Sequence, residues 1–158
     1  MNIFTIPSHF HIHPSDSFRV FLPAADIPRF VGHGSVDLGI TGQDVVREAQ
    51  MDDLITELLP LSFGKCKLQI QVPEHGPIKT VEDLAGKRVV TSFDNIADDY
   101  FSKLDEKLGL TGSAKTTIEY IGGSVEAACA LGLADGIGQD LNGAFFLTLT
   151  QDVYSQLI

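Results

Sequence analysis

The stretch that decides the fold is residues 120–138, Tyr-Ile-Gly-Gly-Ser-Val-Glu-Ala-Ala-Cys-Ala-Leu-Gly-Leu-Ala-Asp-Gly-Ile-Gly. An apolar strand ending at Ile121 meets two glycines and Ser124, and an alanine-rich helix follows at once. A glycine-serine turn at a helix start presents free N–H groups and a positive helix end, which suit a phosphate. Glu126 falls in the first helical turn, where its carboxylate can accept hydrogen bonds from sugar hydroxyls. The pattern therefore indicates a phosphorylated sugar as ligand.

The same stretch also fits a strand-turn-helix unit that binds nothing. In that interpretation Ser124 is the N-cap of the helix and Glu126 complements the helix dipole. On architecture alone this second interpretation is favoured, because glycine-rich turns between strands and helices are common. The choice between the two therefore depends on the rest of the chain.

Composition limits the class of protein. The chain has 158 residues, of which 44% are hydrophobic, so it can form one domain or two small lobes. A net charge of −10 argues against nucleic acid or an anionic membrane as the main partner. No apolar run is long enough to span a bilayer and no export signal is visible. We therefore expect a cytoplasmic protein in which Cys66 and Cys129 are small core thiols, not a disulfide.

Predicted helices and strands alternate along the chain. The predicted helices at 27–31 and 125–131 are each followed by a glycine, then an aspartate, then Gly-Ile. This weak internal repeat favours two α/β lobes that meet at a cleft. We place the lobe boundary near residues 72–74, which gives a remnant of the first lobe plus a hinge strand (1–72), a second α/β lobe (73–138) and a divergent C-terminal segment (139–158). The expected elements are helix 27–31, strand 36–40, half-buried strand 65–72, a helix start at 80–84 with Thr80 as cap, strand 88–91, helix 92–108 ended by Gly109, strand 117–121 and helix 125–131.

Three strand-to-helix turns are candidates for one ligand site. They lie at residues 40–44, 91–95 and 122–126. Together they offer backbone donors and carboxylates, and Tyr100 on the helix after the second turn adds a flat aromatic ring. This set fits a ligand with phosphate, ribose and an aromatic base. Tyr100 fits equally well as a core residue beside Phe101.

No motif for a covalent nucleophile and no metal-binding motif is recognisable in the sequence. If the protein is an enzyme, we expect it to act by positioning and charge stabilisation. Its catalytic residues are not identified from the sequence.

Five runs of sequence point to a known family. They are Val-Phe-Leu-Pro-Ala-Ala-Asp-Ile-Pro (20–28), Val-Asp-Leu-Gly-Ile-Thr-Gly-Gln-Asp (36–44), Phe-Gly-Lys-Cys-Lys-Leu (63–68), Asp-Leu-Ala-Gly-Lys (83–87) and Gly-Ser-Val-Glu-Ala-Ala-Cys-Ala-Leu-Gly-Leu-Ala-Asp (123–135). These runs resemble ATP phosphoribosyltransferase, the first enzyme of histidine biosynthesis, in its fungal forms, and they follow the family's order and spacing almost continuously from residue 20 to residue 137.

The resemblance implies a bilobal α/β fold with lobes like those of type II periplasmic binding proteins, a hinge strand and an incomplete first lobe. It also implies transfer of phosphoribosyl from phosphoribosyl pyrophosphate to N1 of ATP, with Mg²⁺ as cofactor and a homo-oligomer as a possible assembly. In this family Glu126 is expected at the ribose hydroxyls and Tyr100 at the adenine. The full set of expected substrate-binding residues is Ser124, Glu126, Ala130, Gly132, Ala134, Asp135, Thr41, Gly42, Asp44 and Tyr100.

The chain departs from the family pattern at both ends. Residues 1–18 do not match the family's opening segment, and the residues after Ile137 do not match its 5′-phosphate loop. We therefore expect this chain alone to form little phosphoribosyl-ATP. The alternatives are a catalytically inactive nucleotide- or partner-binding fragment, and a solute-binding module that binds an amino acid and does not respond to ATP.

Overall fold

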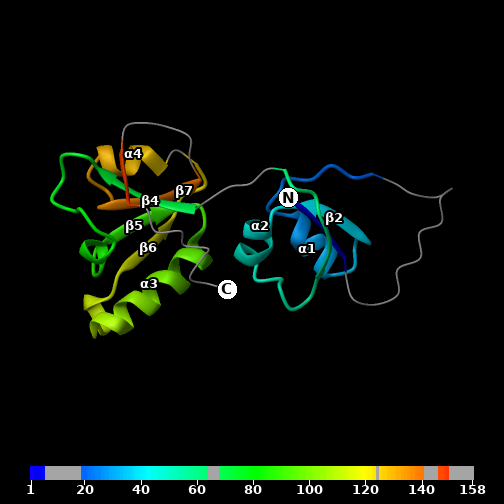
Figure 1. The fold of residues 1–158 in the computed structure, drawn as a ribbon, viewed down its shortest axis with the longest axis horizontal. Helices are drawn as coiled ribbons and strands as arrows, with labels where there is room; N and C mark the ends of the chain where they lie inside the picture. The colour runs from blue at the N-terminus through cyan, green and yellow to red at the C-terminus, as the bar shows by residue number, and fades with distance from the viewer. Residues whose placement is uncertain (6–18, 64–67, 124, 141–145, 150–158) are drawn as a thin grey trace. The chain divides into compact units, whose positions relative to one another are not determined.

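The chain divides into two compact units, Met1–Lys65 and Cys66–Ile158 (Figure 1). The computed structural model describes residues 1–5, 19–63, 68–123, 125–140 and 146–149. Each unit has its own β-sheet and its own helices. The predicted α/β organisation in two parts is therefore confirmed.

The first unit is a three-stranded antiparallel sheet with helices on one face. Phe4 of the central strand packs with Val31 and Val46 of the two helices and with Ile55. Gly39 allows this packing, because a Cβ atom there would lie 2.7 Å from methyl groups of the first helix. The strand order is β2-β1-β3, and the elements are β1 (Asn2–Thr5), α1 (Ile27–Gly32), β2 (Leu38–Thr41), α2 (Gln43–Glu48) and β3 (Thr56–Pro60).

The opposite face of this sheet carries an exposed row of apolar side chains. Ile3 of β1 is paired with Ile40 of β2 on one side and with Leu59 of β3 on the other. Directly paired residues project to the same face of a sheet. Ile40 is 50% exposed and Leu59 is 51% exposed, so this row is open to solvent in the described part of the unit.

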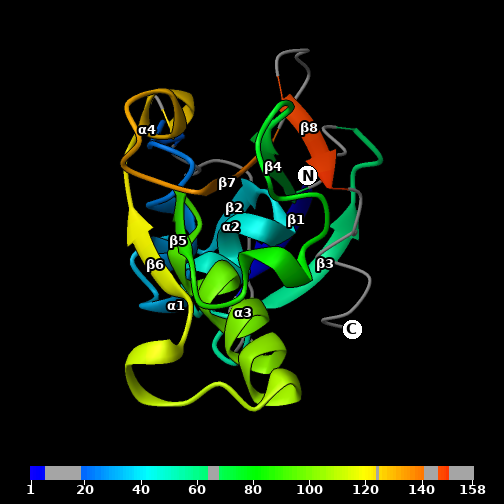
Figure 2. The same ribbon diagram turned by 90° about the vertical axis from the view of Figure 1, so that its left-hand side faces the viewer.

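The second unit is a five-stranded mixed sheet in the order β6-β5-β7-β4-β8, which Figure 2 shows from one edge strand to the other. β5 runs parallel to both β6 and β7, whereas β4 runs antiparallel to both β7 and β8. The elements are β4 (Leu68–Pro73), a 3-10 turn (Glu82–Leu84), β5 (Arg88–Thr91), α3 (Asp94–Leu108), a second 3-10 turn (Gly112–Ala114), β6 (Thr117–Tyr120), α4 (Val125–Ala130), β7 (Gly136–Asp140) and β8 (Phe146–Leu149).

Helices α3 and α4 cover opposite faces of the second sheet (Figure 1). The central strand β5 supplies fully buried residues to both sides. Val89 packs with Phe101 and Leu104 of α3, whereas Val90 packs with the α4 residues Val125 and Ala128. The central strand β5 is therefore buried on both faces of the sheet, as expected for a parallel strand covered by helices.

The predicted local elements agree with the structure where strong signals mark their ends. Strand 88–91 is confirmed residue for residue, and α3 ends before Gly109, whose φ of 72° closes the helix. The expected half-buried strand at 65–72 appears as β4 and lies between β7 and β8 in the second unit. β8 and the end of β7 place part of the C-terminal segment 139–158 in the same sheet.

The predicted cap at Thr80 is wrong. The Asp83 carboxylate instead accepts hydrogen bonds from the backbone N–H groups of Lys79 and Thr80, both at 2.9 Å. These two bonds, that from Lys79 first, hold the pKa of Asp83 below its ordinary value. The element is a short 3-10 turn starting at Glu82, and no side chain caps it at Val81.

None of the helices in the described part of the chain has the length and apolar character needed to cross a membrane.

Candidate functional site

The carboxyl ends of the neighbouring parallel strands β5 and β6 form the candidate site. The chain leaves β5 toward α3 on one face of the sheet and leaves β6 toward α4 on the other. The two strand ends are joined directly, because the N–H of Ile121 donates to the carbonyl oxygen of Thr91 at 2.9 Å. Open α/β sheets bind ligands outside the carboxyl ends of strands whose connections diverge in this way.

The end of β5 is held by Thr91, which is fully buried. Its hydroxyl oxygen accepts a hydrogen bond from the N–H of Phe93 at 2.9 Å and so shapes the turn into α3. On the neighbouring strand β7, a Cβ atom at Gly138 would lie 3.2 Å from the same hydroxyl oxygen. The side chain of Asp94 lies in the first turn of α3, where a carboxylate complements the helix dipole.

The turn after β6 is open to solvent. Gly122 and Gly123 are both exposed, and a Cβ atom at Gly123 would meet no other atom within 4 Å. A ligand can therefore approach this backbone closely, as the phosphate interpretation requires. Ser124 lies outside the described residues. Glu126 is the second residue of α4, in the predicted first turn, and its side chain also lies outside the description.

Helix α4 has only six residues, so it depends on tertiary contacts for its stability. Val125 and Ala128 pack on the sheet, and Ala130 at the end of the helix is exposed. The half-buried Cys129 is a free thiol whose pKa is raised by burial and, to a smaller extent, by the charge of Asp135. The predicted core role of Cys129 agrees with this environment, whereas Cys66 lies outside the described residues.

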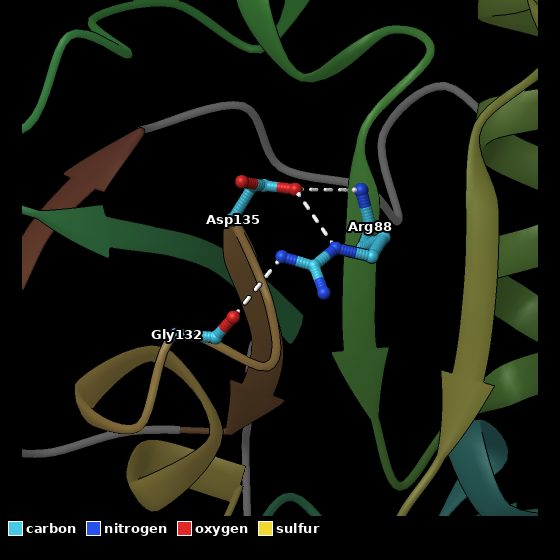
Figure 3. Close-up of polar contacts among 3 residues, drawn as sticks. All are labelled: Arg88, Gly132 and Asp135. Atoms are coloured by element: carbon cyan, nitrogen blue, oxygen red, sulfur yellow. Dashed lines mark hydrogen bonds and ion pairs between the residues drawn. The ribbon is translucent and has the colours of Figure 1, made fainter.

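Asp135 binds the start of β5 at the opposite edge of the parallel strands (Figure 3). Its Oδ2 atom accepts a hydrogen bond from the backbone N–H of Arg88 at 3.0 Å and lies 3.5 Å from the Nε of the same residue. The guanidinium Nη2 donates to the carbonyl oxygen of Gly132 at 3.1 Å. Ala134 between them is buried. Gly132, Ala134 and Asp135 thus lie at the amino ends of β5 and β7, whereas the Gly122–Gly123 turn lies at a carboxyl end.

Sequence reasoning did not single out Arg88. Arg88 is the first residue of β5, and its partner Asp135 comes just before β7. The sequence does not show that these two strands are parallel neighbours. That pairing brings the two residues together although 47 positions separate them.

Thr41, Gly42 and Asp44 lie together in the first unit, where β2 leads into α2. Thr41 is buried and its hydroxyl donates to the carbonyl oxygen of Ala24 at 3.4 Å. The Asp44 carboxylate lies over Gly42, because a Cβ atom at Gly42 would collide with it. The structure therefore groups these three residues, separately from the candidate residues of the second unit.

Tyr100 lies in the core of the second unit. It is 7% exposed, and its ring meets that of Phe101 edge to face with centroids 5.3 Å apart. Burial, assisted by the charge of Glu82, raises the pKa of its hydroxyl. The structure thus places Tyr100 in the core, and its contact with adenine remains a prediction.

The described residues contain no group of three or more His, Cys, Asp or Glu side chains that could hold a metal ion. A metal bound by protein side chains alone is therefore not supported within that part of the chain.

Comparisons with known proteins agree on one family. Residues 23–141 match the family model for ATP phosphoribosyltransferase (HisG). The ATP phosphoribosyltransferase of Yarrowia lipolytica is 60% identical over 119 residues, and that of Schizosaccharomyces pombe is 55% identical over 126 residues. Each alignment covers 75% of this chain but only 38% and 41% of the two relatives, so the chain spans about two fifths of their length.

A solved structure supports the fold. The ATP phosphoribosyl transferase (HisG:HisZ) complex from Thermotoga maritima matches with a TM-score of 0.55 and 23% identity. The match covers 80% of this chain and 63% of that chain. Together with the two sheets, it confirms the predicted fold class.

Proposed function

Since the chain belongs to the ATP phosphoribosyltransferase family, we propose that it is part of an enzyme that transfers phosphoribosyl from phosphoribosyl pyrophosphate to N1 of ATP. The products are phosphoribosyl-ATP and pyrophosphate, in the first step of histidine biosynthesis. The observation that supports this proposal most strongly is the exposed Gly122–Gly123 backbone at the carboxyl end of β6, which lies within the matched region 23–141. We further propose that the reaction takes place in the cytoplasm.

The reaction needs little covalent chemistry from the protein. The adenine N1 forms a bond to C1 of the ribose while the bond from that carbon to the pyrophosphate oxygen breaks. Positive charge develops on the sugar ring and negative charge on the leaving pyrophosphate, so oriented backbone dipoles and carboxylates lower the barrier. We assign the phosphoribosyl group to the Gly122–Gly123 turn, Ser124 and Glu126, and the adenine to Tyr100. Thr41, Gly42 and Asp44 of the first unit are proposed as further substrate-binding residues.

We assign the remaining predicted residues to the same phosphoribosyl-binding segment. Ala130, Gly132, Ala134 and Asp135 follow Glu126 along α4 and the turn into β7. Of these, Ala134 is buried in the core and Asp135 accepts a hydrogen bond from the start of β5. Their contribution to binding is part of the proposal.

We propose that Mg²⁺ arrives with phosphoribosyl pyrophosphate. Proteins hold Mg²⁺ through one or two carboxylates together with substrate phosphates, not through a complete cage of side chains. This mode fits a described region without a cluster of three or more metal-binding side chains. When bound, the ion supplies positive charge to the departing pyrophosphate.

Binding and turnover test the proposal separately. Isothermal titration of the purified chain with phosphoribosyl pyrophosphate and MgCl₂ is expected to show binding, and Glu126→Gln is expected to weaken it about tenfold. The control Glu119→Gln changes an exposed carboxylate on β6 and is expected to leave the affinity unchanged. Equal affinity of the wild type and Glu126→Gln would contradict the assigned ribose contact. Absence of binding by the wild type would contradict the proposed function for this chain.

The second candidate function is an inactive nucleotide- or partner-binding fragment. The residues after Ile137 do not match the family's 5′-phosphate loop, which favours this alternative for the chain by itself. Ultraviolet absorbance of the adduct distinguishes the two, because the fragment binds phosphoribosyl pyrophosphate or ATP without forming phosphoribosyl-ATP. A module that binds an amino acid and ignores ATP would contradict both.

We also propose that the chain self-associates. The row of Ile3, Ile40 and Leu59 is apolar, with Ile3 half-buried and the other two exposed, and such a face favours protein contacts. Light scattering is expected to show a mass above 17.1 kDa that Ile40→Lys returns to the monomer value. A monomeric wild type at all concentrations would refute this part.

A further inference from the structure

We propose that Arg88 is a positioning residue for the substrate-binding turn. With Asp135 it fixes the segment after α4 to the start of β5, and so sets where the helix begins beyond the Gly122–Gly123 turn. This inference rests on the proposed function, because it assigns a further residue to the same site. Arg88 does not touch the turn itself and acts through α4.

The segment after α4 has few apolar contacts to hold it. Leu131 is 72% exposed and Leu133 is 54% exposed, on either side of Gly132. Gly132 has a φ of 70° and ends the helix, and Leu133 donates its N–H back to the carbonyl oxygen of Ala128 at 2.8 Å. The carbonyl oxygens of Ala127, Ala128 and Cys129 in the last turn accept backbone N–H groups from residues 131–134, whereas the carbonyl oxygen of Gly132, beyond the helix, accepts from the Arg88 side chain.

Arg88, at the start of β5, holds the segment that follows the helix. Its Nη2 atom reaches the carbonyl oxygen of Gly132 at 3.1 Å, and its Nε atom lies 3.5 Å from the Asp135 carboxylate. Backbone bonds complete the joint, because the N–H of Arg88 donates to Asp135 Oδ2 at 3.0 Å and the N–H of Asp135 donates to the Arg88 carbonyl oxygen at 2.9 Å. Figure 3 shows the guanidinium between the two acceptors.

The planar guanidinium explains why arginine is needed here. It directs one N–H group to the carbonyl oxygen of Gly132 and another to the carboxylate of Asp135. A lysine ammonium cannot reach both acceptors with the same geometry. α4 spans only six residues, Val125–Ala130, so a displacement at Gly132 is expected to shift the start of the helix as well. The position of the turn thus depends on a contact at the other edge of the sheet.

Hydrogen exchange and ligand affinity test this role together. In Arg88→Ala, amide exchange of the peptide covering residues 125–135 is expected to rise about two- to tenfold, and affinity for phosphoribosyl pyrophosphate is expected to fall by a similar factor. Exchange in α3 is expected to stay unchanged. Arg88→Lys is expected to recover only part of both effects.

The matched control is Lys87→Ala, which removes the same charge from the exposed neighbouring position. It is expected to change neither exchange nor affinity. If exchange rises equally in α3 and in residues 125–135, Arg88 supports the fold as a whole and the positioning role is overturned. Unchanged affinity in Arg88→Ala beside normal binding by the wild type overturns it as well. A wild type that does not bind phosphoribosyl pyrophosphate overturns the proposed function first, and the positioning role with it.

Discussion

Asp105 is a buried carboxylate that joins several elements of the second unit. It is 1% exposed, and it lies on α3 facing the segment that enters β6. Its two carboxylate oxygens accept hydrogen bonds from the N–H and the hydroxyl of Thr116, both at 2.7 Å. The same hydroxyl oxygen accepts a bond from the N–H of Gly86 at 2.9 Å, so one side chain joins α3 to the approaches of β5 and β6.

Asp105→Ala is expected to lower the free energy of unfolding by about 2–4 kcal/mol. Each hydrogen bond to a charged group contributes about 1.5–3 kcal/mol to stability. Part of this sum is offset, because the variant no longer buries a carboxylate and water can reach the half-buried Thr116. Asp105→Asn keeps one acceptor in place and is expected to lose about half as much.

Urea unfolding followed by far-ultraviolet circular dichroism measures this loss, since α3 is the longest described helix. The matched control is Asp99→Ala on the same helix. Asp99 pairs with Lys103 at 3.1 Å, but the two side chains are 58% and 60% exposed, so its removal is expected to cost about 0.3–0.5 kcal/mol. Equal losses in the two alanine variants would refute the reasoning that burial gives the Asp105 network its strength.

Three further predictions concern other parts of the molecule. In a Cys66→Ser background, Cys129 is expected to react with iodoacetamide more slowly in the native than in the urea-unfolded protein, because the raised pKa of its thiol favours the unreactive neutral form. The stability gained by burying the neutral thiol is present below the ordinary thiol pKa and is lost as the pH rises through the raised pKa of the folded state. Equal reaction rates in the native and unfolded proteins would contradict this prediction. Tyr100→Leu is expected to lower the free energy of unfolding by about 1–2 kcal/mol, and an unchanged ATP affinity of the folded variant would contradict the adenine contact. Gly39→Ala is expected to lower the thermal midpoint, because the added Cβ would collide with α1 and lower the free energy of unfolding by about 1–3 kcal/mol. The control Gly123→Ala adds a Cβ in open space and is expected to leave the midpoint unchanged. An unchanged midpoint in Gly39→Ala would show that the helix can shift to accept the methyl group.

The local elements of the second unit could be predicted because their ends carry strong signals. α3 begins after a strand and ends at a glycine that takes positive φ, and the sequence marks both events. β2 begins two residues later than expected, because the N–H of Val36 still bonds to the carbonyl oxygen of Phe30 at the end of α1. Such a backbone contact leaves no trace in the pattern of side chains.

Strand pairing was beyond the reach of the sequence. The mixed sheet places β4 between β7 and β8 and antiparallel to both, although the alternating pattern of β4 only indicated a half-buried strand. Residues Leu68, Ile70 and Val72 of β4 are all buried in the core of the second unit. Their pattern is the same whichever strands lie beside them, so the period of hydrophobicity fixes a face but not a neighbour.

The candidate site shows how one continuous motif divides between two tasks. Residues 123–135 were interpreted as a single binding segment, yet a helix that connects parallel strands must carry the chain from the carboxyl edge of the sheet back to the amino edge. Once Gly123 is placed at the carboxyl end of β6, Asp135 before β7 has to lie at the opposite edge, where Arg88 holds it. The first part of the motif is therefore exposed at the edge where we propose that the ligand binds, whereas the last part is bound to Arg88 at the other edge. The pattern of residues alone does not distinguish the two parts, and only the path of the chain separates them.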